Sequence, residues 1–166
     1  MAKKISAVRV VKYGGKKKVM MYSGPKTKKT YKKQFNTFEE EVARLVNKER
    51  TDRGLQPLTL NSSLANVARI KSADMRDNNY FGHISPTYGD PGQMLQRFGI
   101  NWRSYGENIA AGQSTPAAVM NSWMNSPGHR SNILNPNFTD IGVGYVPGTS
   151  SSTYSSYWTQ LFIQRP

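Results

Sequence analysis

The feature that most constrains this chain is an abrupt change in charge near residue 36. The first 35 residues hold 12 lysines and arginines and no acidic residue, whereas the rest of the 166-residue chain holds 11 basic and 10 acidic residues. The net charge of +13 therefore belongs to the N-terminal segment, and the remainder is nearly neutral. We expect a basic extension over residues 1–35 and one domain over residues 36–166, which is long enough to bury a core.

The basic extension carries two runs of β-forming residues on either side of Gly14 and Gly15. This pattern predicts a β-hairpin, which would need to pack on a partner because an isolated hairpin is only marginally stable in water. Residues 24–33 then form a turn and a basic linker.

The charge of this extension favours contact with an anionic polymer or surface, and a solvated linker is the alternative. No base-reading motif accompanies the charge, which argues against sequence-specific binding of nucleic acid. The lysines expected to contact a polyanion are Lys16, Lys17, Lys18, Lys26, Lys28, Lys29, Lys32 and Lys33.

Helical patterns dominate the first two thirds of the domain. Apolar residues recur at helical spacing after Thr37, which forms a predicted capping box with Glu40, and again after Asn61 or Ser62. Shorter helices are expected over residues 91–98 and from Pro116 onward.

Two β-forming runs follow, over residues 141–146 and 157–163, and a polar loop joins them. Gly142 and Gly144 in the first run would admit close packing or a bulge. Helices followed by paired strands place the domain in the α+β class.

Cysteine is absent from the chain, so disulfides and thiolate metal sites are excluded. Residues 1–35 contain no apolar run of the kind found in a signal peptide. We also expect no transmembrane segment, because no stretch is long and apolar enough.

The segment Ser126-Pro127-Gly128-His129 places a histidine directly after a helix break. Proline disfavours the α conformation in the residue before it, so a helix through Trp123 should end at Ser126. A second helix can begin at once, with Ser126 as its N-cap and Pro127 in its first turn. His129 then lies near the positive end of that helix, which favours a neutral imidazole able to act as a base or a metal ligand. A buried, hydrogen-bonded structural histidine is the alternative.

Two more polar residues are candidates for a site. His83 lies in a turn-rich segment flanked by aromatic residues, where packing could hold the ring while one edge stays open. Glu107 is the only acidic residue between Asp90 and Asp140, and its neighbours are small or apolar. Each also has a structural interpretation, as a loop histidine bonded to the backbone or as a buried acceptor.

The order of these motifs resembles the CAP superfamily, which comprises cysteine-rich secretory proteins, antigen 5 and pathogenesis-related 1 proteins, and its bacterial branch in particular. The resemblance spans residues 37–164 and leaves the basic extension outside. The motifs that carry it are residues 81–86 (FGHISP), 106–110 (GENIA), 122–134 (SWMNSPGHRSNIL) and 141–145 (IGVGY).

The resemblance implies an α-β-α sandwich, with a small antiparallel sheet between helical layers, in a secreted or cell-surface protein. It also implies a surface cleft that holds His83, Glu107 and His129, with Ser126 beside it, and that binds a divalent metal in some relatives. Eukaryotic relatives often carry a second glutamate where this chain has Asn125-Ser126, and the absence of that carboxylate weakens any mechanism with two carboxylates.

The chemistry of the three residues can be judged directly. Two neutral imidazoles and one carboxylate could hold zinc and leave a position for water, which could attack a carbonyl or phosphoryl group. Without a metal, Glu107 could orient one histidine as a general base. Neither arrangement has an obvious nucleophile, because N-capping explains Ser126 more simply.

The sequence therefore favours a binding domain over an enzyme, with a small molecule, lipid or peptide as its unknown ligand. A metal-dependent hydrolase that uses the same cleft is one alternative. An interaction protein with a vestigial site is the other.

Overall fold

The computed structural model describes residues 8–13, 16–21 and 36–166, and the chain divides into two units, residues 1–32 and 33–166. In the first unit, strand β1 (Val8–Tyr13) pairs antiparallel with β2 (Lys16–Met21). The linker predicted over residues 24–33 lies outside the described residues, and so do the side chains of the lysines assigned to polyanion contact.

The described part of the second unit holds five helices and a four-stranded sheet. The helices are α1 (Thr37–Thr51), α2 (Ser62–Asp77), α3 (Pro91–Arg97), α4 (Pro116–Met124) and α5 (Pro127–Ile133). The strands are β3 (Thr59–Leu60), β4 (Ser104–Ala111), β5 (Asp140–Pro147) and β6 (Ser156–Gln164). Over these residues, no helix combines the length and the apolar character needed to cross a membrane.

The sheet has the order β3-β5-β6-β4. Strands β5, β6 and β4 are antiparallel neighbours, as predicted for the sheet, but β3 runs parallel to β5. The sheet is therefore mixed. The parallel pairing of β3 with β5 is possible because a long connection, which includes α2 and α3, separates the two strands in the chain.

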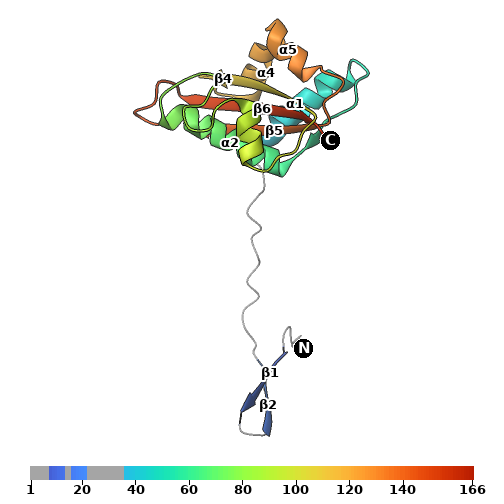
Figure 1. The fold of residues 1–166 in the computed structure, drawn as a ribbon, viewed down its shortest axis with the longest axis vertical. Coiled ribbons are helices and arrows are strands. Elements are labelled where there is room, and N and C mark those ends of the chain that lie inside the picture. Colours follow the sequence, from blue (N-terminus) through green and yellow to red (C-terminus); the bar gives the residue numbers. More distant parts are fainter. Residues whose placement is uncertain (1–7, 14–15, 22–35) are drawn as a thin grey trace, which may run out of the picture. The chain divides into compact units, whose positions relative to one another are not determined.

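Helices cover both faces of this sheet, which confirms the α-β-α sandwich (Figure 1). On one face, Val46 of α1 and Trp123 of α4 share a buried cluster with Ile141 and Phe162 of the sheet. On the other face, helices α2 and α3 bury their apolar residues against Leu161 and its neighbours on β6.

Helix α2 approaches strand β5 very closely, and two glycines make this approach possible. A Cβ added at Gly142 would lie 2.3 Å from the backbone carbonyl carbon of Leu64, and one at Gly144 would lie 2.2 Å from that of Ala68. These glycines serve close packing, which is one of the two roles predicted for them.

Helix α1 begins with a different capping box from the predicted one. The N-cap is Asn36, whose side chain accepts from the Glu39 amide (2.9 Å), while the Glu39 carboxylate accepts from the Asn36 amide (3.1 Å). The predicted pair of Thr37 and Glu40 is wrong because Glu39 is fully buried, where it also pairs with Arg69 (2.7 Å). That tertiary contact fixes the register of the first turn.

Candidate functional site

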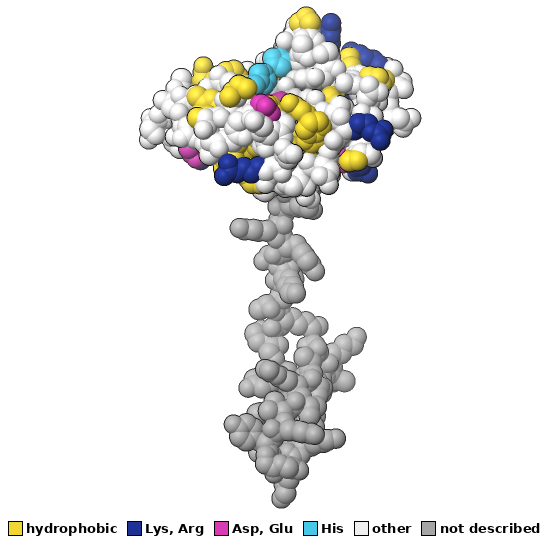
Figure 2. Space-filling model, viewed as in Figure 1, with side chains coloured by type: hydrophobic (Ala, Val, Ile, Leu, Met, Phe, Trp, Pro, Cys, Tyr) yellow, Lys and Arg dark blue, Asp and Glu magenta, His cyan; other side chains and the backbone are white. Residues whose placement is uncertain are grey.

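The three predicted site residues come from different elements and lie on one face of the domain. His83 is in the loop after α2, Glu107 is in β4 and His129 is in α5. The two histidines border the same cavity, of about 520 Å³, and their side chains lie together on the face in view in Figure 2. His83 Nδ1 lies 2.7 Å from Glu107 Oε1, and donation from Nδ1–H to the carboxylate assigns the tautomer in which Nε2 is the other ring nitrogen, available to a ligand when the ring is neutral.

Side-chain amides join α5 to strand β4 and so place His129. Asn108 Nδ2 donates to the His129 carbonyl oxygen (3.1 Å), and Asn132 Nδ2 donates both to the Glu107 carbonyl oxygen (3.2 Å) and to Asn108 Oδ1 (2.9 Å). From α4, Trp123 Nε1 donates to the Ile109 carbonyl oxygen (3.2 Å). The sequence patterns assigned no role to the asparagines, although both lie within the quoted motifs.

A buried lysine holds the loop that carries His83. Lys71 of α2 is only 1% exposed, and its Nζ donates to the carbonyl oxygens of Gly82 (2.8 Å) and His83 (2.9 Å) and to Tyr80 Oη (3.1 Å). Burial lowers the pKa of Lys71, and the negative charges of Glu107 and Asp74 act in the opposite direction. The lysine therefore fixes the backbone of the loop rather than contacting a ligand.

Asp74 completes this support one turn further along α2. Its carboxylate accepts from the Tyr80 hydroxyl, from Ser85 Oγ (2.6 Å), from Thr87 Oγ1 (2.7 Å) and from Asn78 Nδ2 (2.7 Å). Burial alone would raise the pKa of Asp74, but the four hydrogen bonds outweigh it and the pKa is lowered. We call Lys71, Asp74 and Tyr80 the loop clamp.

The sequence patterns do not indicate the loop clamp, because Lys71 lies on the apolar stripe of α2 and shares the helical spacing of its core residues. A lysine on an apolar stripe was the available signal, since a buried charge requires partners. The hydrogen-bond acceptors of Lys71 Nζ are mostly backbone oxygens, and a sequence pattern does not indicate where those oxygens lie.

Several polar atoms near the cavity are buried without a hydrogen bond. Among the described residues, Glu107 Oε2, His129 Nδ1 and Gln113 Oε1 have no partner. Ser126 occupies the N-cap position of α5 as predicted, but its side chain makes no capping hydrogen bond, and the residue lines the cavity instead. Unsatisfied buried groups are costly, which makes them informative about a missing partner.

The sequence predicts that His83, Glu107 and His129 together hold a metal. In the described part of the chain, no three His, Cys, Asp or Glu side chains form a group that could hold a metal ion. Glu107 Oε1 is engaged by His83 Nδ1, which is the position of a supporting carboxylate that orients a ligating histidine. Binding of zinc by His83, Glu107 and His129 stays a prediction.

The same residues do not form a nucleophile and base pair. Over the described residues, no serine hydroxyl hydrogen bonds to either histidine, and Glu107 is paired with the more exposed ring, that of His83. Asn125, at the position of the second carboxylate in eukaryotic relatives, donates to Asn121 of its own helix.

Stability should fall on acidification because of His129. Burial, and secondarily the nearby His83, lowers the pKa of His129 below its usual 6.5. Between that lowered value and 6.5 the unfolded chain binds more protons than the folded chain, so the free energy of unfolding should drop as the pH falls through this window. Urea denaturation at a series of pH values measures the slope.

His129→Gln is the matched comparison, because it removes the titrating group and keeps a polar side chain. The difference in unfolding free energy between the wild type and this variant should vary with pH only in the window below 6.5. A difference that is constant across the window would contradict the lowered pKa.

Comparison with known proteins identifies relatives of this chain. The model of the cysteine-rich secretory protein family matches residues 43–162. The protein YkwD of Bacillus subtilis is 54% identical over 128 residues, which cover 77% of this chain and 48% of that protein. The membrane protein YlbC of the same organism is 36% identical over 135 residues, which cover 81% of this chain and 37% of YlbC.

Solved structures share the fold. An extracellular protein of Bacillus anthracis that contains an SCP domain matches with a TM-score of 0.71 and 40% identity, over 90% of this chain and 47% of that one. An outer surface protein of Borrelia burgdorferi matches with a TM-score of 0.69 and 21% identity, over 76% of this chain and 92% of that one. The chain thus spans about half the length, or less, of the Bacillus relatives.

Proposed function

Since the chain belongs to the cysteine-rich secretory protein family, we propose that it is a secreted or cell-surface binding domain whose cleft between His83 and His129 holds a small ligand. One observation carries this proposal, a cavity of about 520 Å³ that two histidines border and that has unpaired polar atoms near its walls. Small-molecule sites have this size and this mixture of apolar walls with a few polar groups. The extracellular Bacillus anthracis relative supports the location.

Binding is favoured over hydrolysis because the polar side chains around the two histidines support the structure of the cleft. Lys71, Asn108 and Asn132 donate to backbone carbonyl oxygens, and these bonds hold the segments that carry the two histidines. A rigid cleft of this kind lowers the entropy cost of binding. No serine is paired with a histidine in the described residues, which an activated nucleophile would require.

A fragment screen by NMR tests the cleft. Small uncharged fragments added to the isotope-labelled chain should shift the backbone amides of residues 81–83, 109–111, Ser126 and His129 more than those of residues remote from the cavity. The reason is that these residues line the cavity. Trp123→Ala, which removes an apolar wall, should abolish the shifts, whereas Trp102→Ala outside the cavity should leave them unchanged. Shifts scattered over the surface would contradict a ligand cleft.

Zinc is tested in the same preparation by calorimetry. His83→Ala and His129→Ala should each abolish binding of zinc, and Glu107→Gln should weaken it by about 10- to 100-fold, because a supporting carboxylate contributes that much. If zinc binds equally well to both histidine variants, the zinc site is not in this cleft. The prediction for the fragments is independent of that outcome.

We also propose that the basic extension attaches the domain to an anionic polymer or surface. The support is the charge itself, 12 lysines and arginines without an acidic residue over residues 1–35. On a dextran sulfate column, the full chain should elute at higher salt than residues 36–166 alone, because released counterions make such contacts sensitive to salt. Equal elution of the two forms would contradict this role.

A further inference from the structure

We infer that the ligand of this cleft is an uncharged glycan, whose sugar rings stack on Phe81 and Tyr154. The inference rests on the proposed function, since it assumes that the cleft binds a ligand, and it narrows the class of that ligand. Charge, aromatic surface and unused polar groups each support it.

Among the described residues that line the cavity, none is acidic and none is a lysine or an arginine. Its lining residues are Phe81, Gly82, His83, Ile109, Ala110, Ala111, Gln113, Ser122, Trp123, Ser126, His129 and Tyr154. Neither Glu107 nor Lys71 is among these lining residues, and both are bonded to His83. A wall without a formal charge offers nothing to compensate a charged ligand, so it suits an uncharged one.

Two exposed aromatic rings meet at the cavity. Phe81 is 47% exposed and Tyr154 is 39% exposed, and their ring centroids lie 5.9 Å apart. Large apolar side chains exposed together at a pocket mark a binding surface. The C–H groups on one face of a pyranose ring can contact the negative face of an aromatic ring, while the hydroxyls at the ring edge remain free to hydrogen bond.

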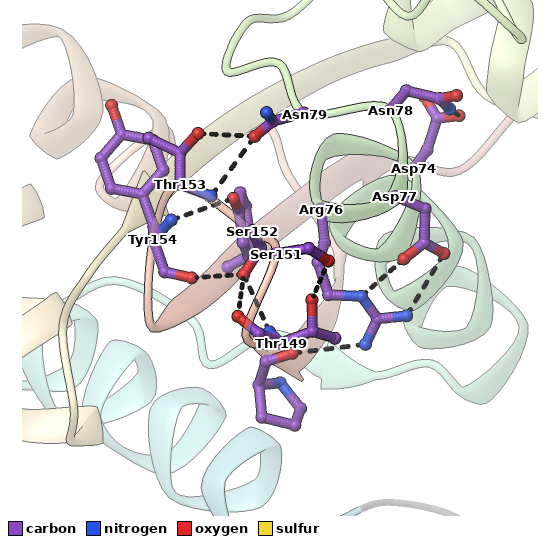
Figure 3. Close-up of polar contacts among 12 residues, drawn as sticks. Asp74, Arg76, Asp77, Asn78, Asn79, Thr149, Ser151, Ser152, Thr153 and Tyr154 are labelled. Carbon is purple, nitrogen blue, oxygen red and sulfur yellow. Dashed lines mark hydrogen bonds and ion pairs between the residues drawn. The ribbon is translucent and has the colours of Figure 1, made fainter.

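Tyr154 is held in place although it belongs to the loop between β5 and β6. Figure 3 shows Asn79, at the end of α2, accepting from the amide and the hydroxyl of Thr153. Ser152 Oγ donates to the Tyr154 carbonyl oxygen (2.9 Å), and the Tyr154 amide donates to Tyr157 Oη (3.2 Å). These bonds hold the backbone of Tyr154, and its ring packs edge-on against Tyr157 with centroids 5.8 Å apart. Both contacts reduce the entropy cost of stacking.

Asn79, which accepts these two bonds, has a backbone φ of 52°. This value lies in the left-handed region, which asparagine tolerates better than most residues. The loop clamp holds the backbone next to Phe81 through the Gly82 carbonyl oxygen. Both rings thus belong to segments that are tied to helix α2.

The unused polar groups suit hydroxyls. Among the described residues, Gln113 Oε1 and His129 Nδ1 lack partners, and the Ser126 side chain makes no capping bond. Trp123 offers only its ring, because its Nε1 donates to the Ile109 carbonyl oxygen. A sugar hydroxyl can both donate and accept, whereas a hydrocarbon ligand would leave these acceptors unpaired.

Titration of the isotope-labelled chain with cellotriose and with triacetylchitotriose tests the inference. At least one of the two should give saturable NMR shifts at residues 81–83, 126–129 and 154. Phe81→Ala and Tyr154→Ala should each weaken binding by about fivefold, in keeping with one aromatic stacking contact. Trp102→Ala is the control, since Trp102 is comparably exposed but lies outside the cavity. Circular dichroism confirms that each variant is folded.

The blocked peptide acetyl-trialanine-amide is titrated in parallel, because a neutral peptide is the competing ligand class. Binding of the peptide without either saccharide would overturn the glycan inference and leave the proposed cleft standing. Saccharide binding that neither aromatic variant weakens would also overturn it. If neither saccharide binds but fragments still shift the cleft amides, only the glycan inference fails. If the fragments also give no shifts, the proposed function fails together with the glycan inference.

Discussion

Gly142→Ala is expected to lower the free energy of unfolding by about 3 kcal/mol, at the upper end of overpacking effects. The added methyl group would lie 2.3 Å from the Leu64 carbonyl carbon and 2.4 Å from the Ala65 amide nitrogen. These are backbone atoms of α2, so a change of side-chain rotamer cannot relieve the clash. The helix would have to move away from β5 and open the cluster formed by α2, α3 and β6.

Denaturation in urea measures this effect, and Gly128→Ala is the matched control. A Cβ at Gly128 meets nothing within 4 Å, and the residue lies in the first turn of α5. We expect that control to be neutral or slightly stabilising, because alanine favours a helix over glycine. A loss below about 1 kcal/mol for Gly142→Ala would show that α2 can shift at little cost.

Lys71→Met is expected to cost about 3–5 kcal/mol, the range found when one partner of a buried charge network is removed. Methionine keeps most of the side-chain volume but leaves the Gly82 and His83 carbonyl oxygens without their donor. It also leaves the negative charges of Asp74 and Glu107 without the cation that faces them. The loss should therefore exceed that of an ordinary surface substitution.

The control for this prediction is Lys48→Met, which breaks an exposed pair with Asp52 and should change stability by less than about 0.5 kcal/mol. A second measurement separates the role of Lys71 in positioning from its role in folding. In a sample that is still folded by circular dichroism, the His83 ring resonances should move in Lys71→Met and stay in place in Lys48→Met. Unmoved resonances would mean that Glu107 alone positions the ring.

The sandwich could be predicted from the sequence because its motifs are local and their order is specific. The helix break at Pro127 and the glycines of β5 follow from backbone sterics, which the sequence states directly. For strand β4, residues 101–110 predict only a turn or a short extended piece, because Gly106 and Asn108 are poor strand formers. It is a full strand since each of its residues pairs with β6, from Ser104 opposite Gln164 to Ala111 opposite Tyr157.

Within the site, the three titratable residues were predicted and the groups that position them were not. His83, Glu107 and His129 are rare residue types in unusual local settings, so each stood out by itself. Asn108, Asn132, Lys71 and Asp74 act through contacts with atoms distant in sequence, many of them in the backbone. Such contacts depend on the tertiary structure, and neither periodicity nor spacing encodes them.

The bonds that join α4 and α5 to β4 have a second consequence, which concerns solubility. Strand β4 ends the sheet, and an uncovered end strand offers its backbone to strands of other molecules. Here the Glu107 and Ile109 carbonyl oxygens, which alternate along the strand, are taken by Asn132 and Trp123. The contacts that build the cleft thus also occupy part of the edge on which intermolecular sheet growth would begin, so damage to the cleft wall should raise the tendency of the protein to aggregate.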